Sequence, residues 1–129
     1  MNKKQEIVIN RCYGGFGLSH KGIMEYAKIT GIKLYPKIDD IQKNEKVNFD
    51  NAMVVHYYTS QKMEDKSYFR TWDIKRDDEA LIKVVKKMGK KANGRCADLK
   101  IVKIPADVKW EIEEYDGSES ISEEHRTWN

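Results

Sequence analysis

Apolar residues along this chain recur in short clusters, and the spacing within each cluster separates strands from helices. Glu6 to Asn10 is a β-branched run typical of a buried strand, and Leu99 to Ile104 is a second one, closed by Pro105. In Lys109 to Tyr115 apolar and charged residues alternate, and Asp116-Gly117 then gives the strongest hairpin signal of the chain. We therefore expect the segment from Ser118 onward to return as a strand.

Two segments are predicted to form helices. From Glu79 to Asn93 the apolar side chains form one stripe, and Asp77 before them is a good N-cap. His20 to Thr30 is the other segment. It follows an N-cap residue, Ser19, and precedes Gly31, which suits the position after the last helical turn.

The middle of the chain is predicted to hold three more short strands, over Lys33 to Tyr35, Ala52 to Tyr58 and Ser67 to Trp72. Ile38 to Asn51 is polar and is interpreted as a long surface connection. Together the elements predict a single domain over residues 1–129, of the α/β or α+β class, with two helices packed on a mixed sheet of about five or six strands.

The segment that joins the first strand to the first helix, Arg11 to Ser19 (RCYGGFGLS), has three glycines within four positions. A strand, a glycine turn and a helix start bring backbone N–H groups together at the positive end of a helix dipole, which suits a phosphate. The spacing matches neither the Rossmann fingerprint nor a Walker motif. In the structural alternative the glycines only permit a tight turn, with Tyr13 and Phe16 packing on either side.

Composition narrows the function classes. No apolar run approaches membrane-spanning length, so we expect a cytoplasmic protein without a membrane partner. A net charge of +3 is too small to indicate a nucleic-acid partner. Residues 106–129 hold eight acidic and two basic side chains, a charge of about −6. This asymmetry fits either the interface of a homo-oligomer or two solvated faces.

Nothing in the sequence indicates a cofactor or a metal site. Cys12 and Cys96 lie far apart and form no C-x-x-C pair, which predicts reduced thiols. His56, inside a predicted strand, is interpreted as a core or surface-facing residue with satisfied hydrogen bonds. Asp77-Asp78 has the chemistry to hold a metal, but helix capping explains the pair more simply.

Three segments carry a resemblance: VINRCYGGFGLS (Val8 to Ser19), Arg76 to Asn93 with its RDD start and VVKKMG run, and Trp110 to Trp128 with WEIEEYDG and EEHRTW. In combination they resemble a family of small, largely uncharacterised proteins encoded by bacteriophages and prophages. The resemblance implies provenance rather than a reaction. In size and type of site the chain is also similar to counter-defence proteins that sequester immune signals derived from cyclic nucleotides or ADP-ribose.

The first functional hypothesis is a binding protein that sequesters a small phosphorylated, nucleotide-like ligand without chemistry. Main-chain amides of the glycine segment would hold the phosphate, arginines would neutralise charge, and aromatic rings would stack on the base. The predicted ligand contacts are Asn10, Arg11, Tyr13, Gly14, Gly15, Phe16, Gly17, Ser19, Arg76, His125 and Arg126.

Two alternatives belong to other classes. One is a phosphodiesterase or transferase that uses His125 or His20 as general acid or base. The other is an interaction module that inhibits a host protein through the acidic C-terminal hairpin. Its side chains would imitate the phosphates of nucleic acid; they are Glu111, Glu113, Glu114 and Asp116.

Overall fold

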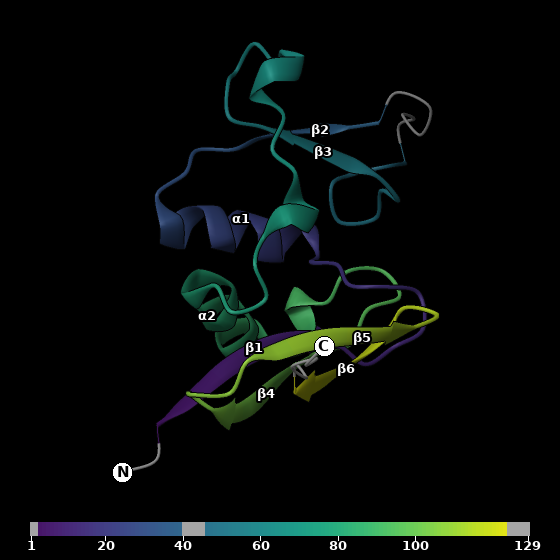
Figure 1. Cartoon of the computed structure of the whole chain (residues 1–129). Coiled ribbons are helices and arrows are strands. Elements are labelled where there is room, and N and C mark those ends of the chain that lie inside the picture. Colours follow the sequence, from purple (N-terminus) through teal and green to yellow (C-terminus); the bar gives the residue numbers. More distant parts are fainter. Residues whose placement is uncertain (1–2, 40–45, 124–129) are drawn as a thin grey trace, which may run out of the picture.

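The computed structural model of the protein describes residues 3–39 and 46–123. Within these ranges the chain is mixed α/β, as predicted (Figure 1). Its main elements are β1 Lys4–Asn10, α1 His20–Thr30, β2 Tyr35–Ile38, β3 Val55–Tyr58, α2 Glu79–Met88, β4 Leu99–Pro105, β5 Trp110–Tyr115 and β6 Ser118–Glu123.

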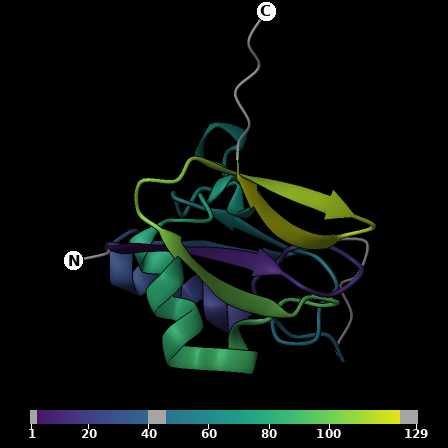
Figure 2. The same ribbon diagram turned by 60° about the horizontal axis from the view of Figure 1, so that its bottom comes forward.

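The strands form three separate antiparallel pairs, β1–β4, β2–β3 and β5–β6. The prediction of one mixed sheet is therefore wrong. Two contacts close the edge of β1 that faces away from β4: Val8 N donates to the carbonyl of Arg76 at 2.8 Å, and Asn10 N donates to the carboxylate of Glu119 at 2.8 Å. A loop and a side chain thus replace the next strand. The β5–β6 hairpin forms a ribbon of its own beside β1 and β4 (Figure 2).

The elements stack in layers, with α1 between the β2–β3 pair and α2, and α2 between α1 and β1–β4 (Figure 1). The larger core lies between α2 and β1, where Val8, Leu81 and Val84 are fully buried. A smaller apolar cluster joins α1 to β3 and includes Ile23 and Tyr57. The β2–β3 pair is therefore fastened to the rest of the protein mainly through one face of α1.

Helix α1 confirms its predicted boundaries. The side chain of Ser19 accepts a hydrogen bond from Gly22 N at 3.0 Å, and Gly31 adopts the left-handed conformation with φ of 80°. The N-terminus of α1 is therefore firmly positioned, which matters for the site described below.

Helix α2 begins at Glu79, as predicted, but its N-cap residue and its C-terminal end differ from the prediction. Its N-cap is Asp78 rather than Asp77, since the Asp78 side chain accepts from the amides of Ala80 and Leu81. The α-helix ends at Met88 rather than at Asn93, because Gly89 leaves the helical conformation (φ 58°, ψ −130°). The chain continues as the 3₁₀ helix η4, Gly89–Ala92.

The predicted strand over residues 67–72 is wrong. Asp65–Ser67 and Thr71–Asp73 form 3₁₀ turns, and Tyr68 between them makes only an isolated bridge with Tyr58. The segment contacts the end of β3 only locally, where Phe69 N donates to the carbonyl of Tyr57, so the alternation of aromatic and basic residues does not mark a strand here. The neighbouring strands also differ from their predicted bounds. Instead of a strand over Lys33 to Tyr35 the chain forms β2, Tyr35–Ile38, and the strand predicted over Ala52 to Tyr58 is shortened to β3, Val55–Tyr58.

The C-terminal hairpin forms as predicted. Asp116 and Gly117 at its turn both have positive φ, 50° and 90°, and Tyr115 pairs with Ser118 across it. His56 on β3 also agrees with its interpretation, since its two ring nitrogens lie 2.9 Å from the Tyr68 hydroxyl and 2.9 Å from an Asp39 carboxylate oxygen.

Candidate functional site

The end of the glycine segment is joined to the region around η4 by backbone hydrogen bonds. Ser19 N donates to the carbonyl of Ala92 at 2.9 Å, the Ser19 hydroxyl donates to the carbonyl of Lys91 at 2.6 Å, and Gly94 N donates to the carbonyl of Gly17 at 2.8 Å. Ser19 is therefore a cap for α1 and a connection to η4 at once. The amide of Ser19 is used by the protein itself.

The first two glycines of the segment face the C-terminal hairpin and Cys96. Gly14 and Gly15 have φ of 125° and 106°, and Gly14 N lies 3.3 Å from the carbonyl of Asp116, to which it donates. A Cβ atom on Gly14 would lie 2.6 Å from Cβ of Cys96, and one on Gly117 would lie 2.4 Å from Gly15 N. Gly14 is thus required by its positive φ and its close approach to Cys96, Gly15 by its positive φ, and Gly117 by the close approach of the hairpin turn to this loop.

Two other predicted contacts, Asn10 and Arg76, belong to a buried polar network centred on Glu119. The guanidinium of Arg76 makes a bidentate ion pair with the carboxylate of Glu119, a residue that is only 5% exposed to solvent. Asn10 is fully buried, and its side-chain amide donates to the carbonyls of Gly117 and Cys12 at 2.8 and 2.7 Å. This network, with the loop glycines, fastens the hairpin to β1, and we call the whole region the hairpin junction.

The remaining predicted contacts lie in or near the hairpin junction. Arg11 donates through Nη1 to the carbonyl of Glu119 at 2.9 Å, and the ring of Phe16 lies 3.6 Å below the guanidinium of Arg76. The side chain of Tyr13 is largely solvent-exposed. His125 and Arg126 lie outside the described residues.

A pocket of about 780 Å³ lies beside the hairpin junction, at the N-terminus of α1. Its walls come from residues 18–23, the loop 49–54 that precedes β3, β3 itself, Thr71, and residues 91–95 after α2. The volume lies in the range of roughly 300–1,000 Å³ that is typical of small-ligand sites. Of the predicted contacts within the described chain, only Ser19 lines this pocket; the others belong to its surroundings.

The inner part of the pocket is aromatic. His20, the first residue of α1, stacks on Phe49 at a centroid distance of 4.9 Å and on Tyr57 at 5.8 Å, and its Nδ1 lies 2.8 Å from the Tyr57 hydroxyl. Burial lowers the pKa of His20, and the charge of Asp50 opposes this shift. Burial, and to a smaller extent Asp50, raises the pKa of Tyr57, so the phenol stays protonated.

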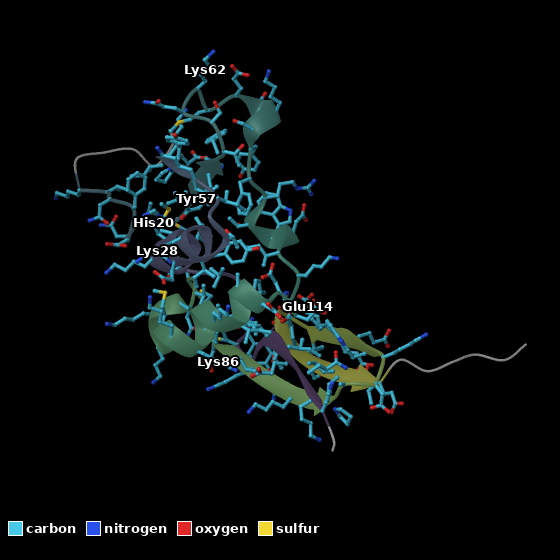
Figure 3. All side chains as sticks on the ribbon, turned by 90° about the vertical axis from the view of Figure 1, so that its left-hand side faces the viewer. His20, Lys28, Tyr57, Lys62, Lys86 and Glu114 are labelled. Carbon is cyan, nitrogen blue, oxygen red and sulfur yellow. The ribbon has the colours of Figure 1, made fainter. Side chains whose placement is uncertain are left out.

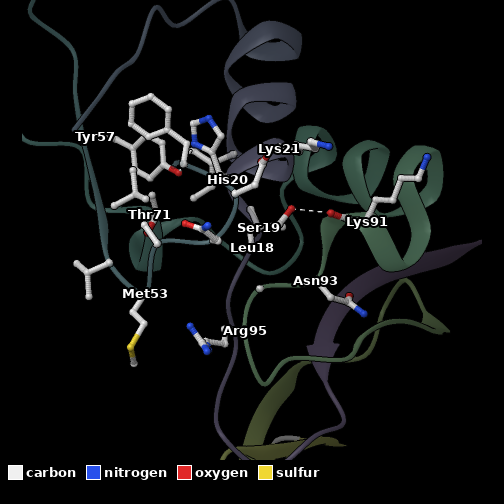
Figure 4. A pocket seen from close by; sticks show the side chains of 18 residues that line it. Leu18, Ser19, His20, Lys21, Met53, Tyr57, Thr71, Lys91, Asn93 and Arg95 are labelled. Carbon is white, nitrogen blue, oxygen red and sulfur yellow. Dashed lines mark hydrogen bonds between the residues drawn. The ribbon is translucent and has the colours of Figure 1, made fainter. Parts of the chain in front are cut away.

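The cations of the pocket lie apart from its aromatic part. Arg95 lies on the side opposite His20 and Tyr57, while the ammonium groups of Lys21 and Lys91 extend along the α2 side (Figure 4). None of these three cations has an ion-pair partner within residues 3–39 and 46–123. In contrast, Lys86 and Lys87 of α2 both pair with acidic side chains. Asp50 also lines the pocket, so the charged lining residues are three cations and one carboxylate, and their net charge is positive.

Sequence reasoning missed most of these lining residues. Phe49 was the single aromatic side chain in a polar connection, and Arg95 followed an Asn93-Gly94 turn. Neither signal stands out, because the pocket is assembled from segments that are distant in sequence and meet only through the layering of α1 and β3.

No helix in the described ranges is long and apolar enough to cross a membrane. The same ranges contain no group of three or more His, Cys, Asp or Glu side chains placed to share a metal ion. Comparisons of the chain with protein-family models, with curated proteins and with solved structures gave no match.

Proposed function

We propose that this protein binds a small phosphorylated, nucleotide-like ligand in the pocket at the N-terminus of α1 and holds it without chemistry. The observation that carries the proposal is that three cations with no acidic partner among the described residues, Arg95, Lys21 and Lys91, line the same pocket as a group of aromatic rings. Free cations favour an anionic group, and an apolar, partly aromatic wall favours a ring system.

The proposed site keeps the ligand class expected from the sequence and moves its position. The backbone amides of Gly14 and Ser19 and the guanidinium of Arg76 are bonded to protein groups, so they offer little to a phosphate. The cations that have no acidic partner among the described residues line the pocket beyond the C-terminal end of the glycine segment; they are Lys21, Lys91 and Arg95. The bacteriophage origin and a counter-defence role remain predictions based on the sequence resemblance.

Isothermal titration calorimetry of the full chain tests the proposal. The panel consists of nucleoside mono- and diphosphates, cyclic mono- and dinucleotides and ADP-ribose. We expect at least one of these classes to bind, and an Arg95→Ala substitution to weaken that binding by about tenfold or more, since a hydrogen bond to a charged group contributes roughly 1.5–3 kcal/mol. Lys62→Ala is the control, because Lys62 lies far from His20 and Tyr57 (Figure 3). Absence of heat with every compound overturns the proposal.

One observation favours an enzyme as a second candidate. His20 lines the pocket, and a protonated Tyr57 hydroxyl can donate to its Nδ1, which leaves a neutral imidazole with its proton on Nε2. Such an oriented imidazole suits general acid–base work on a phosphate ester. Chromatography of nucleotides after incubation distinguishes the two functions: conversion that is lost in His20→Gln supports an enzyme, and intact ligand recovered after heat denaturation supports binding alone.

The inhibition of a host protein by the acidic hairpin stays a prediction without added support. Glu111, Glu113 and Glu114 on β5 are exposed, as solvation of an edge strand alone would require.

A further inference from the structure

The pocket has two chemically different ends, and this difference bears on which nucleotide it would take. Arg95 lies at one end, and His20 and Tyr57 lie at the other (Figure 4). A ligand that spans the pocket therefore meets a cation at one end and aromatic rings at the other. A nucleotide has this layout, with a phosphate separated from a planar base by a sugar.

Asp50 adds a carboxylate to the aromatic end. It lines the pocket, and its charge acts on both His20 and Tyr57, opposing burial at the first and adding to burial at the second. The Asp50 side chain has no hydrogen bond or ion pair with any residue that the structure describes. A free acceptor with two oxygens therefore lies near the rings.

The loop that carries Asp50 is held in place by local hydrogen bonds. The side chain of Asn48 accepts from Asp50 N at 2.9 Å and from Asn51 N at 3.0 Å, and Ala52 N donates to the carbonyl of Asn48 at 2.9 Å. Phe49 in the same turn stacks on His20. The carboxylate is thus presented by an ordered turn next to an aromatic surface.

A carboxylate repels a phosphate and selects for hydrogen-bond donors. Guanine is the only common base with two adjacent donors on its Watson–Crick edge, N1–H and the 2-amino group, which match the two oxygens of one carboxylate. Adenine and cytosine offer an amino group alone, and uracil offers a single imino N–H.

We infer that the pocket is specific for a guanine nucleotide, with Asp50 accepting from the base, Phe49 against the ring, and Arg95 on the phosphate. This inference rests on the proposed function and adds the identity of the base. Asp50 is then a specificity-determining residue, and Arg95 provides affinity for the phosphate that all nucleotides share.

Calorimetry with GMP, IMP and AMP tests the inference. IMP retains the N1–H donor of guanine but lacks the 2-amino group, and AMP lacks both donors. We expect wild-type protein to bind GMP about tenfold or more tightly than AMP, with IMP between them, because each ligand differs in the hydrogen bonds it donates to a charged acceptor. Asp50→Asn should abolish the preference while AMP binding persists.

Glu114→Gln is the matched control, since it removes the same charge from an exposed carboxylate on β5 that does not line the pocket and lies apart from His20 and Tyr57 (Figure 3). It should keep the wild-type preference. Equal affinity of wild-type protein for GMP and AMP, or a preference for GMP that survives in Asp50→Asn, overturns the guanine assignment. These outcomes leave the proposed function standing if the binding depends on Arg95, whereas absence of binding by all three nucleotides counts against both.

Discussion

The hairpin junction and the pocket are neighbours, and they treat polar groups in opposite ways. At the junction Glu119, Arg76 and Asn10 are bonded to one another or to backbone groups and are withdrawn from solvent. At the pocket Arg95 and Asp50 line an open space, and neither has a hydrogen-bonded partner for its charge among residues 3–39 and 46–123. Paired polar groups stabilise the fold, and unpaired ones are available to a ligand.

This contrast shows that residues which stand out in a sequence can serve the fold rather than a ligand. The glycines and arginines that stand out in the chain serve the attachment of a hairpin, while the groups left free for a ligand come from an ordinary turn and a polar loop. A substitution at the junction should therefore change stability, and a substitution at the pocket should change binding.

The largest effect is expected from Glu119→Ala. It leaves the guanidinium of Arg76 partly buried without its carboxylate, and breaking a buried ion pair in this way typically destabilises a protein by about 3–5 kcal/mol. The free energy of unfolding from urea denaturation measures the loss. In contrast, Arg95→Ala removes an exposed cation that has no ion pair with the described part of the chain, and it should change stability by less than about 0.5 kcal/mol.

Two controls qualify this comparison. Glu114→Ala removes an exposed carboxylate from the same hairpin and should also leave stability nearly unchanged. A Glu119→Ala protein as stable as Glu114→Ala would show that the buried network does not hold the hairpin, and the distinction between junction and pocket would then fail.

A smaller effect is expected within the glycine segment, where two substitutions of the same type should differ. Gly14→Ala places a Cβ atom 2.6 Å from Cβ of Cys96 at φ of 125°, and strain of this kind costs about 1–3 kcal/mol. Gly17→Ala places its Cβ in open space and should be close to neutral. Thermal denaturation of the two variants compares them directly; equal losses would contradict the role assigned to the positive φ of Gly14 and its close approach to Cys96.

The sequence predicted those parts of the fold that depend on local chemistry. The caps of α1 and the Asp116-Gly117 turn were confirmed because each is determined by a few adjacent residues. The prediction of a single sheet was wrong. Arg76 and Glu119 occupy the edge of β1 where another strand was expected, and both residues are distant from β1 in sequence. Alternating apolar and polar residues predict a strand, but they do not show whether its edge will pair with another strand or with a polar side chain.

The candidate site follows the same division. The sequence drew attention to the approach to α1, and Ser19 does line the pocket. Phe49, Asp50 and Arg95 could not be found in this way, because their common position depends on how β2–β3 packs against α1. Ligand chemistry was predictable as a class, and the position of the site required the tertiary structure.

The smallest expected effect concerns pH and is confined to the pocket. Burial lowers the pKa of His20 below its ordinary value of 6.5, so the folded protein binds this proton less readily than the unfolded chain does. The stabilising contribution of the neutral ring is complete above pH 6.5 and is lost as the pH falls through the lowered pKa. The difference in unfolding free energy between wild-type protein and His20→Gln should therefore shrink from pH 7.5 towards pH 5, as a series of urea titrations can measure. Parallel stability profiles for the two proteins would mean that His20 is as accessible to protons in the folded state as in the unfolded one, and the pocket would then lack the partly desolvated interior on which stacking of a base depends.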